Sequence, residues 1–280
     1  MVDLQGTPAV ASTAVRCPGS AQQRRGNNVV SLRELVDYCD QLLEADGFQD
    51  YCPNGLQVEG RADVGRVVSG VTASQALIDA AAQRGADLVL VHHGFFWKGE
   101  DARITGMKRR RLGTLLAEQL SLLAYHLPLD AHPELGNNAQ LARRLGLSEQ
   151  GRFGAGAGPD LACFGTLETA LTVTDLSARI GDALGRQPQC IAGGPQAIRS
   201  VGWCTGAAQS YLEEAARRGL DAFISGEISE PTVHIAREYG IHYFAAGHHA
   251  TERYGVQALG EHLAGKFAIE HTFIDIDNPV

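Results

Sequence analysis

Two pairs of adjacent histidines in this 280-residue chain each follow a strongly apolar run. One pair, His92 and His93, comes directly after the run at 88–91, and the other, His248 and His249, follows a second such run. Apolar runs of this length are typical of buried strands, so each pair is expected where a strand ends and a loop begins. Because ligands bind outside the carboxyl ends of strands in open α/β sheets, these imidazoles are placed to do chemistry.

Further candidate groups follow the same pattern. A third apolar run ends in His126, and Asp130 follows it by four residues. Glu252 comes four residues after His248, and the two share a helix face if a helix begins there. Imidazole and carboxylate groups at three strand ends can converge on a metal ion. The predicted ligands are His92, His93, Asp130, His248 and Glu252, with His126 and His249 expected just outside them.

Five ligands exceed what one tetrahedral ion usually takes from a protein. Two ions roughly 3.5–4 Å apart, bridged by a carboxylate, would use all of them. A lone histidine at a strand end is more often a satisfied polar group than a ligand, but the matching positions of these residues favour metal binding. Ligands without thiolate suit zinc, iron, manganese or nickel. The other histidines are expected to be structural or solvent-facing: His132, His234, His242, His262 and His271.

Four ordered segments closely resemble motifs of the NIF-three-like family, whose members are commonly labelled GTP cyclohydrolase type 2 homologues. These segments are NGLQVEG at 54–60, VHHGFFWK at 91–98, HLPLDAHPELGNNAQ at 126–140 and GHHATER at 247–253. The resemblance covers about residue 30 to the C-terminus. It implies that the five predicted ligands bind two divalent metal ions. It also implies the compact bacterial form, which lacks an inserted middle domain and assembles as a hexameric ring.

Composition and charge argue against several classes of protein. No stretch approaches the roughly 20 apolar residues of a membrane helix, and a net charge of −8 argues against generic nucleic-acid binding. The basic run at 108–111 is the local exception. A solvated helix start is its expected role, although it could attract a phosphate. Six cysteines without a CxxC motif or paired spacing favour a reducing cytoplasm.

The order of apolar and amphipathic segments predicts an α/β protein with two related lobes, central mixed or parallel sheets, and a dinuclear metal site at the lobe interface. Residues 29–130 and 235–280 are expected to form the metal-binding lobe, and residues 131–234 the second lobe. Residues 1–28 are expected to be a disordered extension, or to follow from a start codon placed too early. Expected elements are a helix capped by Ser31 with Glu34, helices at 74–84, 107–119, 138–145 and 173–184, and strands at 66–71, 88–91 and 189–192.

The glycine-rich segment at 152–164 is interpreted as a flexible turn. No GK[ST] follows it and no strand clearly precedes it, so a phosphate loop is not expected.

An internal repeat relates residues 84–94 to residues 218–228 at a constant offset of 134. The second copy carries Glu227 where the first has His93, so Glu227 is also expected at a strand end. There it could act as a general base toward a metal-bound water, or hold a metal ligand in place. A surface carboxylate is an equally good alternative.

A dinuclear site of this kind predicts a metal-dependent hydrolase that acts on a small molecule, in particular a nucleotide or a phosphoester-like compound. Two ions can generate hydroxide near neutral pH and hold the attacked oxygen. The alternative is a non-catalytic protein that buffers or delivers metal, or that serves as a ring-shaped scaffold. An open coordination position would distinguish a catalytic site from a closed structural or storage site.

Overall fold

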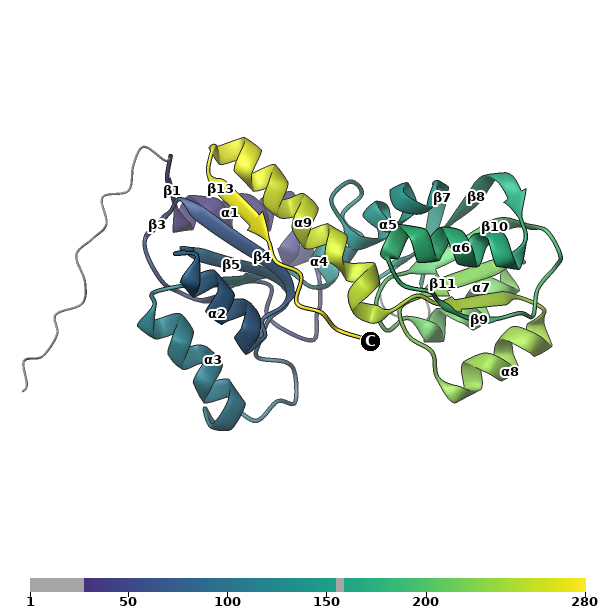
Figure 1. Cartoon of the computed structure of the whole chain (residues 1–280), viewed down its shortest axis with the longest axis horizontal. Helices are drawn as coiled ribbons and strands as arrows, with labels where there is room; N and C mark the ends of the chain where they lie inside the picture. Colours follow the sequence, from purple (N-terminus) through teal and green to yellow (C-terminus); the bar gives the residue numbers. More distant parts are fainter. Residues whose placement is uncertain (1–27, 155–158) are drawn as a thin grey trace, which may run out of the picture.

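The computed structural model describes residues 28–154 and 159–280. Two lobes, each built on one central sheet, lie side by side along the long axis of the molecule, and the long helix α9 (His248–Phe267) runs between them (Figure 1). This arrangement confirms the predicted mixed α/β fold. The expected extension at 1–28 falls outside the described residues except for its last position. None of the described helices is both long and apolar enough to cross a membrane.

The first lobe contains a five-stranded sheet in the order β13-β4-β5-β6-β2. Neighbouring strands are parallel except at the edge, where β2 runs antiparallel to β6. A short antiparallel ribbon of β1 and β3 packs with this lobe. The strands are β1 (Val30–Ser31), β2 (Gly55–Val58), β3 (Asp63–Val64), β4 (Arg66–Thr72), β5 (Leu88–His93), β6 (Ser121–Ala124) and β13 (Glu270–Phe273).

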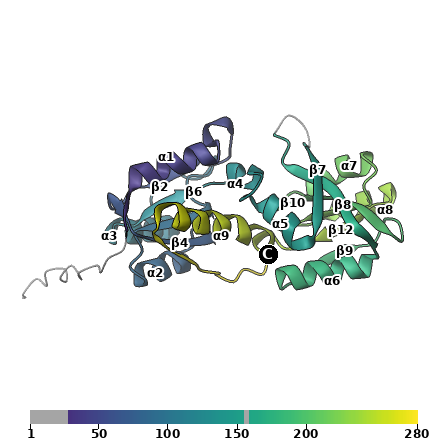
Figure 2. The ribbon, with the colours of Figure 1, turned by 90° about the horizontal axis from the view of Figure 1, so that it is seen from above.

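Helices cover both faces of this sheet, because successive strand residues point to opposite sides. In β5, Leu88 and Leu90 pack with residues of α1 (Leu32–Leu42) and α9, whereas Val89 and Val91 pack with residues of α2 (Gln75–Gln83) and α3 (Gly106–Ala117). Figure 2 shows α1 on one side of the sheet and α2 on the other. All four side chains are fully buried, which explains the uninterrupted apolar run.

The second lobe contains a six-stranded sheet in the order β7-β8-β10-β11-β12-β9. Its three central strands, β10, β11 and β12, are parallel, and the flanking strands are antiparallel to their neighbours. The strands are β7 (Leu147–Phe153), β8 (Ala162–Leu171), β9 (Gln189–Ile191), β10 (Ile198–Cys204), β11 (Ala222–Ser225) and β12 (His242–Ala245).

Helices also cover both faces of the second sheet. Trp203 and Ile224 pack with residues of α5 (Asn137–Leu145) and α6 (Val173–Leu184), and Phe223 and Tyr243 pack with residues of α7 (Leu212–Arg217) and α8 (Glu230–Tyr239). The remaining described elements are α4 (Leu127–Ala131) and two short 3-10 turns, η1 (Ala45–Gly47) and η2 (Gln209–Tyr211).

The internal repeat is visible in the hydrogen bonds of two equivalent aspartates. Asp87, before β5, and Asp221, before β11, each accept from two main-chain amides at the start of the neighbouring strand. The donors are Gly65 and Arg66 for Asp87, at 2.9 and 3.0 Å, and Arg199 and Ser200 for Asp221, at 2.8 and 2.9 Å. Both donors of the second set lie 134 residues after those of the first, so the offset found in the sequence is also structural.

Most of the expected elements are present with nearly the expected bounds. The Ser31 hydroxyl accepts from the main-chain amide of Glu34 at 3.2 Å and caps α1 as predicted. Each of the other four expected helices begins and ends within two residues of its predicted bounds. The strands expected at 66–71 and 189–192 differ by one residue.

The structure places two boundaries differently from the sequence analysis. β12 pairs with β11 in the second sheet, so the chain returns to the first lobe at α9 and not at residue 235. The apolar run identifies the strand, but only its pairing shows which sheet it joins. β7 extends into the first two residues of the glycine-rich segment at 152–164, where no strand was expected, and β8 begins before its end, so the predicted turn is shorter than expected. β7 is an edge strand with largely exposed side chains, which explains its weak apolar pattern. Residues 155–158 of that segment lie outside the described residues.

Candidate metal centre

His92 and His93 are the last two residues of β5, so this strand includes the pair instead of ending before it. Nδ1 of His92 donates to the main-chain oxygen of Tyr125 at 2.9 Å. Nδ1 of His93 lies 3.1 Å from Oγ1 of Thr72. With Nδ1 engaged in both rings, Nε2 is left for the neighbouring carboxylates. Hydrogen bonds of this kind fix the orientation of metal-binding imidazoles in proteins.

Asp130 is supplied by the short helix α4. Its Oδ1 accepts from Nδ2 of Asn137 at 2.8 Å and from Oγ1 of Thr205 at 3.3 Å. Thr205 directly follows β10 of the second sheet, so this contact connects α4 to the other lobe. The Asp130 side chain is only 11% exposed, and its orientation is set by both contacts.

His248 and Glu252 lie one turn apart at the start of α9. The second histidine pair therefore opens a helix and does not close a strand. Gly247, with a φ of 100°, makes the turn from β12 into this helix, a conformation that favours glycine. Nδ1 of His248 lies 2.7 Å from Oε1 of Glu227, and its Nε2 lies 3.1 Å from Oε2 of Glu252. His248 and Glu252 therefore share one face of α9, as predicted.

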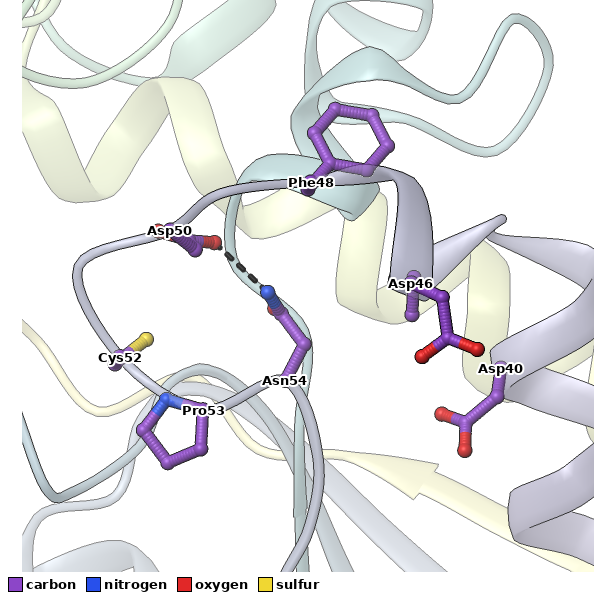
Figure 3. A pocket seen from close by; sticks show the side chains of 8 residues that line it. Asp40, Asp46, Phe48, Asp50, Cys52, Pro53 and Asn54 are labelled. Carbon is purple, nitrogen blue, oxygen red and sulfur yellow. Dashed lines mark hydrogen bonds between the residues drawn. The ribbon is translucent and has the colours of Figure 1, made fainter.

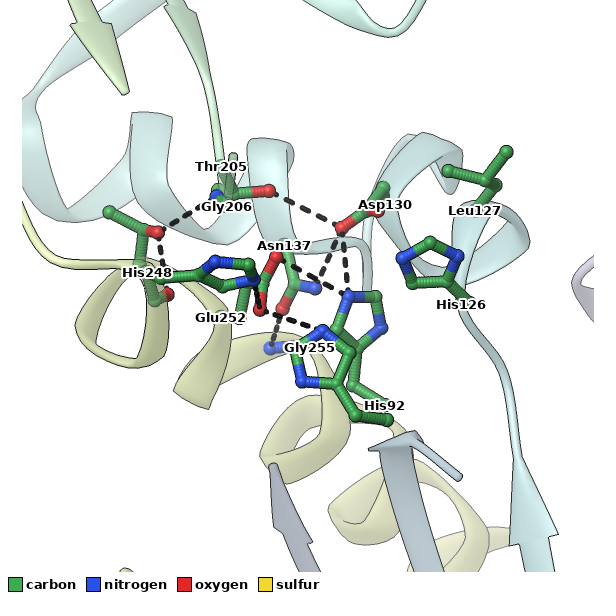
Figure 4. Close-up of polar contacts among 12 residues, drawn as sticks. His92, His126, Leu127, Asp130, Asn137, Thr205, Gly206, His248, Glu252 and Gly255 are labelled. Carbon is green, nitrogen blue, oxygen red and sulfur yellow. Dashed lines mark hydrogen bonds and ion pairs between the residues drawn. The ribbon is translucent and has the colours of Figure 1, made fainter. Parts of the chain in front are cut away.

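The five side chains form two groups of donors that share Glu252 (Figure 4). In the first, Nε2 of His92 lies 3.5 Å from both Oδ1 of Asp130 and Oε1 of Glu252. In the second, Oε2 of Glu252 lies 3.2 Å from Nε2 of His93 and 3.1 Å from that of His248. Ligand atoms at about 2.0–2.1 Å from a tetrahedral ion lie about 3.3 Å from one another. Both groups therefore have the spacing of metal ligands.

Two of these atoms are buried and make no hydrogen bond within the described part of the chain. They are Nε2 of His92 and Oε2 of Glu252. A buried polar group left without a hydrogen bond costs roughly 1–3 kcal/mol, and one cation in each donor group would satisfy the atom that belongs to that group. Imidazole and carboxylate donors suit zinc, iron, manganese or nickel. The residues present fit one divalent ion in each group.

The carboxylates attract positive charge to this buried position. Burial alone would lower the pKa of His92, but Asp130 and Glu252 outweigh it and raise that pKa to about 9. The pKa of His248 is likewise raised to about 9, because Glu252 and Glu227 outweigh the effect of burial. Burial lowers the pKa of His93 to about 3 despite the nearby Glu252. A divalent cation bound at this position would be stabilised by the same carboxylates.

His126 lies next to the two groups, as expected, and together with His92 and His93 it forms a third set of nearby donors. Its Nδ1 lies 2.7 Å from Oδ1 of Asp50. The loop around Asp50 is closed by a hydrogen bond from Nδ2 of Asn54 at 2.9 Å (Figure 3). His126 is therefore held from the side opposite the candidate ligands.

The charge of Asp50 is stabilised by these contacts. Burial would raise the pKa of its carboxyl group, but hydrogen bonds from His126 and Asn54 lower it to about 2. Cys52 lies close to Asp50 and His126. Burial raises the pKa of Cys52 to about 12, so its thiol remains protonated and is no nucleophile near neutral pH.

His249 lies outside both groups and faces the C-terminal segment, not the candidate ligands. Its Nε2 lies 2.7 Å from Oδ1 of Asp275, and its main-chain amide donates to the oxygen of Val280 at 2.9 Å. The remaining histidines belong to none of the donor groups found among the described residues. Their ring contacts lie elsewhere: His132 with Leu135, His234 with Glu230, His242 with Pro195, His262 with Tyr38 and His271 with Ser69.

Sequence analysis missed the residues that orient the candidate ligands and the neighbouring His126. They are Asp50, Thr72, Tyr125, Asn137 and Thr205. Asn137 lies within the family motif at 126–140, so the sequence did contain a signal for its importance. Thr205 lies 75 residues from Asp130 and in no motif, and its role follows only from the folded structure.

A cavity of about 1270 Å³ opens beside the donor groups. Four of the five candidate ligands line it, all except the fully buried His92. Its other walls come from residues within 44–51 and 204–211 and from Trp97, His126, Leu127, Pro159 and Leu161. The basic run at 108–111 lies on α3 and does not line this cavity. Nζ of its first residue, Lys108, pairs with Glu100 at 3.3 Å.

The fold and the donor groups define a class of two-lobed mixed α/β proteins with histidine and carboxylate side chains gathered between the ends of two sheets. Within this class, the chain belongs to the Duf34/NIF3 (NGG1p interacting factor 3) family, whose model matches residues 30–279. This membership confirms the resemblance found in the motifs.

Named relatives are similar over nearly their whole length. A protein of Pseudomonas aeruginosa called "GTP cyclohydrolase 1 type 2 homolog" is 57% identical over 250 residues, which cover 89% of this chain and 99% of that protein. A protein of Vibrio cholerae with the same label is 58% identical over 249 residues, covering 88% and 98%.

Solved structures show the same fold. The protein ybgI, described as of unknown function, superposes with a TM-score of 0.87 at 51% identity, covering 90% of this chain and 100% of that one. A protein from Thermus thermophilus superposes with a TM-score of 0.81 at 35% identity and the same coverage.

Proposed function

We propose that this protein is a dinuclear, metal-dependent hydrolase of a small molecule, with a nucleotide or another phosphoester as its substrate class. The position of Glu252 supports this most strongly, because its two oxygens lie against two separate sets of donors. A buried carboxylate shared in this way is the arrangement expected of a ligand that bridges two ions.

In this proposal one ion would be held by His92, Asp130 and Glu252, and the other by His93, His248 and Glu252. When bound, two divalent ions supply a lowered pKa for water and a positive field at the attacked oxygen. The protein's own part is to hold the ligands rigidly. Each imidazole is fixed through its Nδ1. Each group offers three protein donors, the number typical of catalytic metal sites, in which a further position would be open to water or substrate.

Glu227 has two proposed roles, to position a ligand or to act as the general base. Its hydrogen bond to Nδ1 of His248 favours positioning. A general base must also reach the attacking water within hydrogen-bond distance. The Glu227 side chain is 33% exposed and is not part of the cavity lining, so the contact with His248 supports the positioning role, and the general-base role is left to the test by substitution.

Compartment and assembly are part of the same proposal. The cysteines of the described chain are free, which supports a reducing cytoplasm. A homo-oligomer, as a hexameric ring, is proposed from the family resemblance alone.

The test is metal analysis of the protein as isolated, followed by a substrate screen with zinc, iron, manganese or nickel restored in turn. We expect two ions per chain and turnover of a phosphoester or nucleotide that disappears in Asp130→Ala. A matched control is Asp160→Ala, which removes an exposed aspartate that is no candidate ligand.

Two outcomes would contradict the proposal. Fewer than two ions per chain after reconstitution would remove the dinuclear site. Two tightly bound ions without turnover of nucleotides, phosphoesters or cyclic amides would favour the alternative, a protein that buffers or delivers metal or acts as a scaffold.

A further inference from the structure

We infer that the cavity beside the donor groups accepts a flat heterocyclic ring that carries one anionic group, and that it discriminates against compounds with a second phosphoryl group. This inference rests on the proposed function and narrows its substrate class. It follows from the charge and the side-chain types of the cavity lining.

The lining provides no cationic partner for a second phosphoryl group. None of the described residues around the cavity is a lysine or an arginine. Its charged groups other than histidine are acidic: Glu44, Asp130 and Glu252. Proteins that bind di- and triphosphates use lysine or arginine side chains as well as metal ions to neutralise the phosphate chain. Apart from the histidines at the donor groups, the two proposed ions would be the only source of positive charge among the described residues that line the cavity.

Two divalent ions at the donor groups would carry enough positive charge to compensate one phosphoryl group. Asp130 and Glu252 neutralise half of the charge of two divalent ions. The remainder is at most enough for one phosphomonoester, which carries about −1.5 to −2 near neutral pH, and a metal-bound hydroxide would lower it further. A second phosphoryl group would face Glu44 and the aromatic part of the lining without compensation, which is unfavourable in a partly enclosed site.

Aromatic side chains form the part of the lining next to the donors. Trp97 lies 5.1 Å from the ring of His126, centroid to centroid, and its Nε1 donates to the main-chain oxygen of Gly94 at 3.2 Å, which fixes the indole. Tyr51 lies 6.5 Å from the same imidazole. Burial raises the pKa of Tyr211 to about 12, so its phenol stays neutral. Neutral aromatic faces stack on flat rings and give no attraction to anions.

The volume of the cavity does not explain the proposed discrimination against a second phosphoryl group. Ligand cavities usually measure about 300–1,000 Å³, and at about 1270 Å³ this one has room for a nucleoside triphosphate. Charge is therefore the property of the cavity that separates one phosphoryl group from two or three.

The experiment is a fluorescence titration of the metal-loaded full-length protein. The chain has two tryptophans. Trp203 is fully buried and its Nε1 donates to the main-chain oxygen of Asn138, so a ring that stacks in the cavity should quench Trp97. The probes are guanosine, adenosine and cytidine, each as nucleoside, 5′-monophosphate, 3′,5′-bisphosphate and 5′-triphosphate. The bisphosphate provides a second phosphoryl group without a chelating phosphate chain. Metal content is measured before and after each titration.

We expect at least one monophosphate to bind more tightly than its nucleoside, and at least tenfold more tightly than its bisphosphate and triphosphate. Tyr211→Leu should weaken all forms of that compound by about fivefold or more, the effect of losing one stacking contact. A bisphosphate or triphosphate that binds as tightly as the monophosphate would overturn the inference, as would the absence of quenching by every probe.

A variant that adds charge gives an independent test. Gln49 lines the cavity and is exposed. Gln49→Arg should raise the affinity for the bisphosphate about tenfold and leave the nucleoside unchanged, whereas the matched neutral change Gln49→Met should do neither. An equal gain for nucleoside and bisphosphate would contradict the role of charge. Loss of the ions in the metal analysis would count against the proposed function, whereas a failed selection with both ions bound would count against this inference alone.

Discussion

The carboxylate of Glu227 lies 2.7 Å from Nδ1 of His248, and Glu227 occupies the position that His93 has in the other half of the internal repeat. The rings of His93 and His248 are 5.2 Å apart, centroid to centroid. Equivalent strand ends thus provide a candidate ligand in one half and the residue that orients a candidate ligand in the other.

Glu227→Ala should weaken binding of the ion assigned to His93 and His248 by about 10–100-fold, because an unfixed imidazole is a poorer ligand. The ion assigned to His92 and Asp130 should remain. Competition with a chromophoric chelator would measure both affinities. Glu230→Ala is the matched control, since that carboxylate is 80% exposed and pairs with His234.

Glu227→Gln separates the two proposed roles of this residue. If it acts as the general base, the variant should keep both ions and lose roughly 10²–10⁴ in rate. Weaker binding of one ion with an unchanged rate at metal saturation would instead assign Glu227 to positioning.

Glu252→Ala should release both ions, because this carboxylate is the one side chain shared by the two donor groups. The variant should stay folded, since the sheets on either side are held by their own apolar cores. Elemental analysis together with circular dichroism would check both points. Glu261→Ala, an exposed carboxylate on the same helix, should keep its metal. Two ions retained by Glu252→Ala would exclude the bridging role.

Much of this site could be predicted from local sequence. The spacing of His248 and Glu252 is a helical contact, and Nε2 to Oε2 at 3.1 Å confirms it. His92 and His93 follow an apolar run that is indeed a central strand. In such cases a few neighbouring residues determine the geometry.

The missed parts depend on contacts distant in sequence. Asp50 reaches His126 across 76 residues, and Thr205 reaches Asp130 across 75. The lobe to which β12 belongs is decided by pairing with β11 and by the packing of Phe244 and Tyr243 on opposite faces. An apolar run of four residues shows that a strand exists, but not which neighbour it pairs with.

Asp50→Asn should destabilise the protein near neutral pH and not in acid. The pKa of this carboxyl group in the folded protein is about 2, below its ordinary value of 3.8. Its stabilising contribution is therefore complete above about pH 4 and is lost as the pH falls toward 2. Losing a charged acceptor that is hydrogen-bonded and buried costs roughly 1–3 kcal/mol, or about 2–12 °C in melting temperature for a protein of this size.

Thermal melting of Asp50→Asn and of the parent protein at several pH values would check this prediction. Asp37→Asn is the control, because that side chain is 59% exposed. A gap between variant and parent that stays constant from pH 7 to pH 3 would show that the hydrogen-bonded charge of Asp50 is not its cause.

Removing metal with a chelator should lower the melting temperature, and restoring it should raise the melting temperature in proportion to the logarithm of the free metal concentration. Ions that bind only the folded chain stabilise it by about 4 kcal/mol at a thousandfold excess over Kd, which corresponds to roughly 8–16 °C at this size. The physical cause is the buried Nε2 of His92 and Oε2 of Glu252, which make no hydrogen bond within the described residues. Glu252→Ala should melt at the same temperature with and without metal. A metal-dependent rise that persists in this variant would place the stabilising ion elsewhere in the protein.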